Sequence, residues 1–389
     1  MFWDRPSKKK VALVALVLAV LGTLIFAFWP RPLSPMALSY RAPLFSWSGD
    51  RGQSLALESK LARDAELGQK PEAPIPTAIW FPFSGSRDLA VLVSGLVGDS
   101  SDDLNFQMAS EFVKANVPTL ILPSPTHWSF AVHRLDRAER ESYEASVQSL
   151  CEAYKEMLAR SELRDFWGAG GPRRVFLVGL SLGARHAVSM ARCFEFSKEE
   201  LSIYAVNPPV DLKYAGKTID RLNRGFNENR ARSYLVGLFM TMVKPVAWFL
   251  SVDTALRPLT PFSHELGWLA GASFAARMER LVTERPLAGN GVETRSVEFS
   301  FDRFMQSGPV TIEDFMEELA FARSRTKDQT YVLHAEDDFL IRSDDLLKSG
   351  LLALGKKATI MKTGGHGGLA FEPPYKQGVA RLLEGSAAP

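Results

Sequence analysis

Short, uninterrupted apolar runs recur along the chain from residue 89 onward, and most of them end at a glycine, a proline or a polar cluster. An apolar run of about four to eight residues is typical of a strand that is buried on both faces. The runs therefore predict strands at Leu89–Val93, Thr119–Leu122, Arg174–Gly179, Leu201–Val206, Thr330–Ala335 and Ala358–Met361.

Stretches with a helix-like pattern separate these runs. They predict helices over residues 103–115, 136–160, 182–193 and 375–383, with a further helix between the last two strands. Strand and helix alternate at the spacing of βαβ units, which predicts a mostly parallel central sheet with helices on both faces. Residues 30–80 are mixed, and we expect a tether there followed by one or two early strands.

The alternation stops between residues 209 and 326, where no strand pattern is evident. We expect a helical cap inserted over the carboxyl edge of the sheet, so that the core consists of residues 81–208 and 327–389. Residues 233–252 are very apolar, but Lys244 and Pro245 make a membrane span costly, because a central lysine costs about 2.5–3.5 kcal/mol on insertion. We expect lid helices there, lining an acyl pocket or touching a bilayer surface.

The N-terminus predicts a membrane anchor. Residues 1–10 are basic, and Val11–Trp29 contains 19 residues without a charge, about enough to cross a hydrocarbon core of ~30 Å. A cleaved signal peptide would have an apolar stretch of about 7–15 residues ending in small residues, whereas this one ends in Phe28, Trp29 and Pro30. The basic flank predicts a single-pass protein of the bacterial inner membrane, with residues 1–10 in the cytoplasm and the remainder outside it.

The charge and cysteine content of the chain bear on its binding partners and on its disulfide state. The formal net charge of +2 over 389 residues gives no electrostatic case for nucleic-acid binding. An extracytoplasmic location would permit a disulfide between Cys151 and Cys193, the two cysteines of the chain. We favour the alternative that they are small buried side chains on separate helices. Their spacing does not suggest a metal site.

Ser181 is the candidate nucleophile. It lies in Gly-Leu-Ser-Leu-Gly, between an apolar strand pattern and a helix pattern. Gly179 and Gly183 leave room for a sharp turn that would project the hydroxyl above the sheet edge. The following helix would direct free N–H groups toward the same point, where they favour negative charge. An ordinary serine in a glycine-flanked connection is the alternative.

A serine hydroxyl needs a base, and the base needs an orienting acid. Of six histidines, His366 has the most suitable context, because glycines flank it in a loop between the last strand and the last helix. His186 is expected to be packed or exposed on its helix, and His334 is expected in the core. The acid follows the strand at residues 330–335, where we choose Asp338 and keep Asp337 as the alternative.

The order serine, acid, histidine is that of α/β hydrolases, and from about residue 89 the chain resembles that superfamily. The resemblance rests on VSGLVGDS (oxyanion loop), GLSLG (nucleophile elbow), HAEDDFL (acid turn) and GGHGG (histidine loop). Within the superfamily, the paired aspartates and the Gly-Gly-His-Gly loop are similar to those of bacterial membrane-associated esterase- and lipase-like hydrolases. The resemblance implies oxyanion donors at the backbone N–H groups of Leu96 and Leu182. The chain departs from the pattern at Ser94, where His is usual, and at Phe339, where proline is common.

The resemblance implies a serine hydrolase that cleaves carboxylic esters through an acyl-enzyme, with no cofactor and no metal. The anchor and the apolar cap point to a hydrophobic or lipid-type acyl ester. The same constellation serves an envelope peptidase, an amidase or a thioesterase. A membrane-anchored binding protein without catalysis is the remaining hypothesis.

Overall fold

The computed structural model describes the central sheet, helices packed on both of its faces and parts of the loops at its carboxyl edge. The described residues are 53–57, 75–80, 86–96, 98, 103–126, 130, 142–167, 171–194, 200–219, 304, 307–336, 338, 340–362, 366, 369 and 373–384. The predicted anchor at residues 11–29 and most of the predicted cap lie outside them. No helix within the described ranges has the length and apolar character needed to cross a membrane.

Eight strands form one sheet in the order β1-β2-β4-β3-β5-β6-β7-β8. The six strands from β3 to β8 are parallel, whereas β2 runs antiparallel to both β1 and β4. The strands are β1 (Gln53–Leu57), β2 (Ile75–Trp80), β3 (Asp88–Val93), β4 (Thr119–Leu122), β5 (Arg174–Leu180), β6 (Glu200–Val206), β7 (Thr330–Ala335) and β8 (Ala358–Met361). The predicted mostly parallel sheet is confirmed, and two early strands form within residues 30–80.

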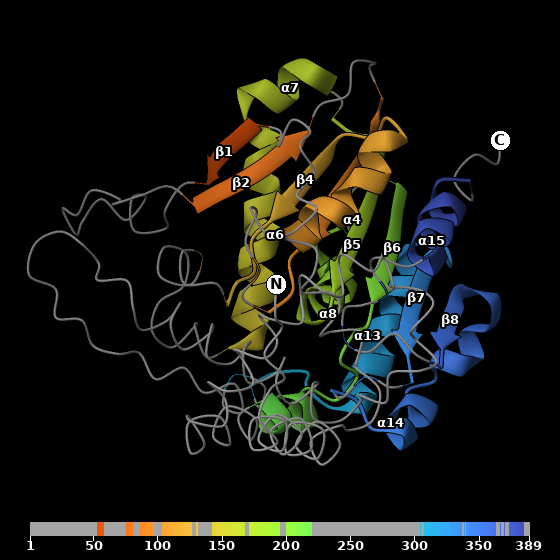
Figure 1. The fold of residues 1–389 in the computed structure, drawn as a ribbon. Helices are drawn as coiled ribbons and strands as arrows, with labels where there is room; N and C mark the ends of the chain where they lie inside the picture. Colours follow the sequence, from red (N-terminus) through yellow and green to blue (C-terminus); the bar gives the residue numbers. More distant parts are fainter. Residues whose placement is uncertain are drawn as a thin grey trace, which may run out of the picture.

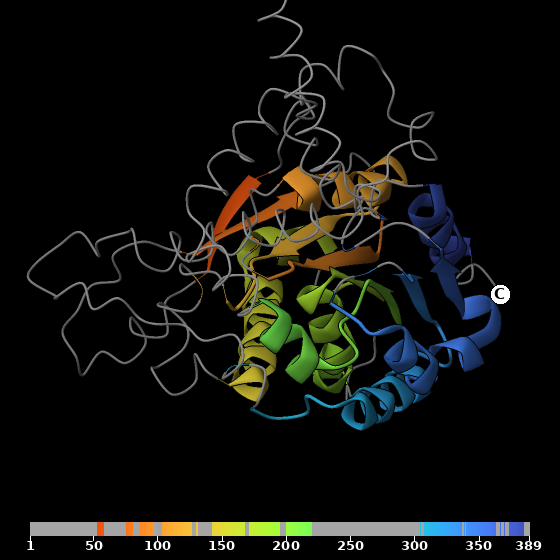
Figure 2. The same ribbon diagram turned by 60° about the horizontal axis from the view of Figure 1, so that its bottom comes forward.

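Helices cover both faces of the sheet (Figures 1 and 2). On one face, α4 (Asp103–Lys114) and α15 (Pro373–Glu384) pack over one apolar cluster. The other face carries α6 (Tyr143–Ala159), α7 (Ser161–Trp167), α8 (Leu182–Ser189), η5 (Met190–Phe194), α13 (Ile312–Arg325), α14 (Ser343–Lys348) and η6 (Leu351–Lys357). The two layers explain why the central strands are apolar without alternation, since neither face meets water.

Side chains of β3 illustrate this two-sided burial. Leu89, Val91 and Val93 belong to the cluster under α6 and α8, whereas Ala90 and Leu92 belong to the cluster under α4 and α15. All five are essentially inaccessible to solvent. A change to a polar residue at any of these five positions would therefore bury an unpartnered polar group, whichever face it occupied.

Helix ends explain where several elements begin and stop. Thr311 and Asp314 form a reciprocal capping box at the start of α13, and the Ser142 hydroxyl accepts from the Ala145 N–H at the start of α6. The helix predicted over residues 182–193 divides into α8 and the 3-10 helix η5. Within the segment predicted as a cap, residues 212–219 are helical, and α13 packs against α8.

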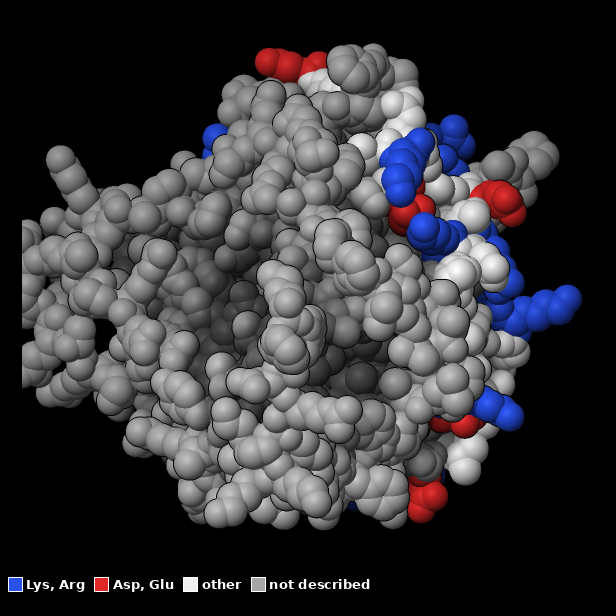
Figure 3. Space-filling view, viewed as in Figure 1, with Lys and Arg blue, Asp and Glu red and all other residues white. Residues whose placement is uncertain are grey.

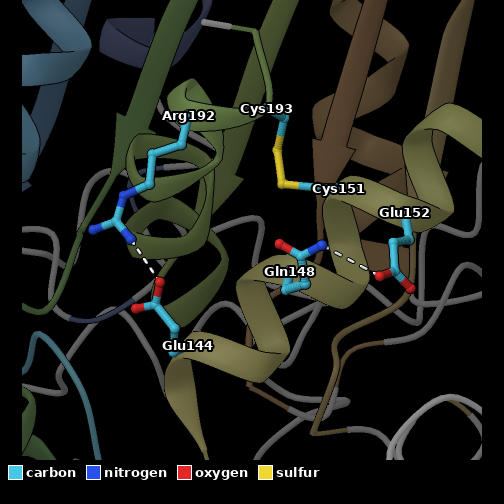
Figure 4. The surroundings of a disulfide bond; sticks show 6 residues. All are labelled: Glu144, Gln148, Cys151, Glu152, Arg192 and Cys193. Atoms are coloured by element: carbon cyan, nitrogen blue, oxygen red, sulfur yellow. Dashed lines mark hydrogen bonds and ion pairs between the residues drawn. A yellow bond between two sulfur atoms is a disulfide. The ribbon is translucent and has the colours of Figure 1, made fainter.

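Cys151 of α6 and Cys193 of η5 are joined in a disulfide, with 5.6 Å between their Cα atoms (Figure 4). Our preference for two unbonded cysteines was therefore wrong. Both were correctly expected on separate helices, but sequence spacing does not reveal that these two helices pack side by side. Beside the disulfide, Arg192 pairs with Glu144 at 2.8 Å, a second link between the same elements.

Charges of both signs are interspersed on the described part of the surface in Figure 3, along the side where α15 and β8 lie. The chain carries 46 basic and 44 acidic residues, in keeping with this mixture. A mixed surface of this kind produces no strong single-sign field.

We predict that the disulfide stabilises the fold mainly by restricting the unfolded chain, because it spans 42 residues. Replacing both cysteines by alanine should lower the free energy of unfolding by about 2–4 kcal/mol, measured by denaturant titration. A reductant should destabilise the natural chain to the same extent and leave the double variant unchanged. Equal stability of all these samples, or two free thiols in the folded protein, would contradict the prediction.

Candidate active site

The turn between β5 and α8 holds Ser181 in an unusual backbone conformation. Its φ of 59° and ψ of −129° lie outside the regions favoured for residues with a side chain. The strained residue is held from both sides, because its N–H donates to the Val206 carbonyl at 2.9 Å and its own carbonyl accepts from Ala184 and Arg185 in the first turn of α8. Such strain is characteristic of functional sites.

The two flanking glycines are required by close packing. A Cβ on Gly179 would lie 2.2 Å from the Gly183 carbonyl oxygen, and a Cβ on Gly183 would lie 2.2 Å from the Val93 carbonyl oxygen. Both contacts involve backbone, which cannot move aside as a flexible side chain can. The predicted elbow glycines therefore allow α8 to begin directly against the ends of β5 and β3.

Ser181, His366 and Asp338 form one hydrogen-bonded chain. The His366 Nε2 lies 2.5 Å from the Ser181 Oγ, and its Nδ1 lies 3.0 and 2.9 Å from the two Asp338 carboxylate oxygens. All three residues are buried, with exposed fractions of 8%, 5% and 3%. The structure thus brings together three residues separated by up to 185 positions, each at the carboxyl edge of the parallel strands.

The carboxylate of Asp338 is held by further donors. The Leu340 N–H donates to Oδ1 at 2.9 Å, and the Asn207 Nδ2 donates to Oδ2 at 3.0 Å. Burial by itself raises the pKa of this carboxyl, but the charge and hydrogen bond of His366, the nearby His334 and the Leu340 N–H outweigh it and lower the pKa to about 2. Asp338 is therefore ionised at neutral pH.

Asn207 is the site residue that sequence reasoning missed. It follows β6 directly, is fully buried, and has a φ of 49°, a left-handed conformation that asparagine tolerates better than most residues. Its N–H donates to the Leu333 carbonyl at 2.7 Å, which fixes the end of β6 against β7. The signal was a polar residue at the carboxyl end of a buried strand, the position that also placed Asp338.

Two other histidines are buried near the site and lack the geometry of a base for Ser181. Burial and then the charge of Arg185 lower the pKa of His186 to about 3, and its ring stacks on Tyr143 at 5.0 Å between centroids. His334 is fully buried in β7 as expected, and burial lowers its pKa. Its ring nitrogens face the carbonyls of Ala335 and Pro208.

The two predicted oxyanion donors belong to segments that adjoin Ser181 in sequence or pack near it. Leu182 is the first residue of α8, and Leu96 lies in a tight turn in which the Gly98 N–H donates to the Gly95 carbonyl at 2.9 Å. Gly95 touches the elbow, since a Cβ there would be 3.0 Å from the Leu180 carbonyl and 3.6 Å from the Ser181 Cβ. Within the described residues, neither the Leu96 nor the Leu182 N–H has an acceptor, so both are available to a ligand.

The remaining predicted site residue, Asp337, lies outside the described residues. In the described part of the chain, no group of three or more His, Cys, Asp or Glu side chains is placed to hold a metal ion.

No protein-family model and no curated protein sequence matches this chain. Solved structures with similarity include an esterase from Pyrococcus furiosus (11% identity, TM-score 0.46, covering 85% of this chain and 89% of that one). An esterase from Pyrobaculum calidifontis has 13% identity and a TM-score of 0.43 over 91% of this chain and 92% of that one. A carboxyl esterase from Bacillus coagulans has 12% identity and a TM-score of 0.46 over 86% and 98%.

The arrangement can activate a hydroxyl for nucleophilic attack. An imidazole placed between a serine hydroxyl and an ionised carboxylate accepts the hydroxyl proton while the carboxylate stabilises the resulting imidazolium. Backbone N–H groups without an acceptor within the described residues, such as those of Leu96 and Leu182, could stabilise a negative charge that develops near Ser181.

We predict that Asn207 keeps Asp338 oriented toward His366. Asn207→Gly removes the donor and tolerates the positive φ, so it should slow labelling of Ser181 by a fluorophosphonate about tenfold without adding backbone strain. Asn207→Asp is nearly isosteric but places an acceptor against the carboxylate, and it should label at least as slowly. Labelling of both variants at the natural rate would show that this hydrogen bond has no role in reactivity.

We also predict an acid-dependent loss of stability. Because folding lowers the pKa of Asp338 from 3.8 to about 2, its contribution is complete above pH about 4 and is lost as the pH falls toward 2. The shift corresponds to about 2 kcal/mol. The difference in unfolding free energy between the natural chain and Asp338→Asn should therefore be about that size at pH 7 and shrink below pH 4. A difference that does not change with pH would contradict this assignment.

Proposed function

We propose that this protein is a serine hydrolase of the α/β-hydrolase type that cleaves carboxylic esters. The observation that carries the proposal is the position of His366, whose two ring nitrogens contact the Ser181 hydroxyl and the Asp338 carboxylate. The chain order of these residues, and the elbow at the end of a central parallel strand, agree with this class of enzyme.

In the proposed reaction, Ser181 attacks the ester carbonyl while His366 accepts its proton. Asp338 holds the imidazole in the tautomer that presents an unprotonated Nε2 and stabilises the imidazolium that forms. His366 then returns the proton to the departing alcohol, which leaves an acyl-enzyme. A water molecule, deprotonated by His366, attacks the acyl carbonyl, and the acid is released as Ser181 regains its proton.

The negative charge of each tetrahedral intermediate falls on the carbonyl oxygen. The N–H groups of Leu96 and Leu182 are the proposed donors to that oxygen, and the start of α8 adds the favourable end of its dipole. Because both groups belong to backbone that packs tightly around the elbow, little reorganisation is needed as the charge forms.

We propose a hydrophobic acyl ester of the lipid type as the substrate and the outer face of a bacterial inner membrane as the location. The basic, then apolar, sequence of residues 1–29 supports a single-pass anchor with its N-terminus in the cytoplasm. The disulfide between Cys151 and Cys193 supports an oxidising, extracytoplasmic compartment for the remainder. The apolar stretch at residues 233–252 supports an apolar substrate pocket in a cap.

Full-length protein in detergent should hydrolyse p-nitrophenyl esters, with a preference for longer acyl chains. Ser181→Ala and His366→Ala should each reduce turnover by about 10⁴-fold or more, because the triad acts as a unit. Ser149→Ala is a matched control, since this buried hydroxyl lies on α6 and has no hydrogen-bond partner within the described residues. It should retain natural turnover.

Other results of these assays would favour a different function. If a fluorophosphonate labels Ser181 but no ester is hydrolysed, the result would contradict the esterase hypothesis and favour a peptidase, an amidase or a thioesterase. Folded full-length protein with neither labelling nor turnover would favour a membrane-anchored binding protein. Equal rates for short and long acyl chains would contradict the proposed lipid-type substrate but would still be consistent with a serine hydrolase.

A further inference from the structure

Ser94 opens the loop that carries one of the two proposed oxyanion donors. It is fully buried at the carboxyl end of β3, and its N–H continues the pairing with β4 by donating to the Leu122 carbonyl at 3.2 Å. Two residues later, the N–H of Leu96 has no acceptor within the described residues. The position of that N–H therefore depends on what fixes the turn to the sheet.

A series of hydrogen bonds made by side chains holds the turn against the sheet. The Ser94 hydroxyl donates to the Leu122 carbonyl at 2.7 Å, and it accepts from the Asn105 Nδ2 at 2.8 Å. Asn105 lies on α4 and is only 3% exposed. The loop is thus tied to β4 on one side and to α4 on the other, with the serine hydroxyl used as both donor and acceptor.

The far end of the turn is fixed in the same region. The Gly98 carbonyl accepts from the Ser124 N–H at 2.8 Å, beyond the end of β4. A Cβ on Gly98 would lie 3.0 Å from the Ser94 Cβ and 3.4 Å from the Asn105 Nδ2, so the turn closes directly over this pair. Both ends of the turn are consequently anchored while its Leu96 N–H stays free.

We propose that Ser94 and Asn105 are positioning residues that hold the Leu96 N–H at the oxyanion site. Asn105 donates to the Ser94 hydroxyl, which donates in turn to the Leu122 carbonyl, so the two side chains together tie the loop to α4 and β4. This inference rests on the proposed function. Two buried polar side chains, one directly after β3 and one on α4, thereby gain a role in turnover in addition to their role in packing.

The physical reason is that an oxyanion donor acts through its exact placement. A donor aimed at the position of the charged oxygen stabilises the transition state more than the bound ester, and loosening it by a fraction of an ångström weakens that difference. Losing the Asn105–Ser94 link should therefore lower kcat and leave KM nearly unchanged.

Asn105→Asp is the informative variant, because the side chain keeps its size and loses its donor. We expect kcat for a p-nitrophenyl ester to fall about 10- to 100-fold and KM to stay within about twofold, somewhat less than the loss of a whole donor. The affinity for a trifluoromethyl ketone, whose adduct with Ser181 places an anionic oxygen in the same site, should fall by a similar factor. Ser94→Ala should behave in the same way.

Two comparisons separate positioning from general destabilisation. Thr330→Val removes a buried 2.9 Å hydrogen bond to Thr326 at the opposite end of the sheet, and it should leave kcat and inhibitor affinity unchanged. The double variant Ser94→Ala/Asn105→Asp should lose no more than about threefold beyond the worse single variant, because both residues belong to one relay. Stoichiometric labelling of Ser181 by a fluorophosphonate shows that each variant retains its nucleophile.

Natural kcat in Asn105→Asp, or equal losses in Thr330→Val, would overturn the positioning role while leaving the serine hydrolase intact. A parallel rise in KM with constant kcat would overturn it as well, by showing a role in binding. Natural protein without any turnover that depends on Ser181 would instead overturn the proposed function, and the positioning role with it.

Discussion

The close approach of α8 to the ends of β3 and β5 is the constraint on which the rest of the structure depends. The first turn of α8 is so near the sheet that Gly183 has no space for a Cβ beside the Val93 and Ser94 carbonyls. This contact places the strained Ser181, the N-terminus of α8 and the turn at Gly95–Gly98 within one small volume. Strain at a single residue is tolerated because backbone hydrogen bonds from β6 and α8 hold it on both sides.

The buried negative charge of Asp338, close to Ser181 and His366, imposes a second requirement, namely enough hydrogen-bond donors to stabilise it. Asp338 is ionised because donors from three separate segments surround its carboxylate: His366, Asn207 and the Leu340 N–H. Removing any one donor leaves part of a buried charge uncompensated, which is costly in a medium of low polarity. The contacts that stabilise the charge also orient the imidazole, so the proposed mechanism couples the stability of the fold to the reactivity of Ser181.

Four residues after Ser181, the buried side chain of Arg185 attaches α8 to the two segments that precede and follow residues 220–303. The Arg185 Nε lies 2.9 Å from the Glu318 Oε2, a contact between charges without the alignment of a hydrogen bond. The Arg185 guanidinium also donates to the carbonyls of Val210 and Pro309, and backbone pairing of Leu212 with Val310 joins the same two segments. The two ends of the intervening segment are therefore fixed to the helix that begins at Ser181.

The sequence by itself determined the strands, the parallel sheet and the positions of Ser181, Asp338 and His366 at strand ends, because two-sided burial and turn chemistry leave local patterns. Only the tertiary structure decided which of those strand ends meet. Asn207 and Asn105 looked like ordinary polar residues, since their partners Asp338 and Ser94 lie 131 and 11 positions away. The sequence left the disulfide as the less favoured alternative for the same reason: only the packing of α6 on η5 brings two cysteines 42 residues apart into contact. Local patterns record burial and backbone conformation, whereas pairings between distant residues depend on how the layers pack.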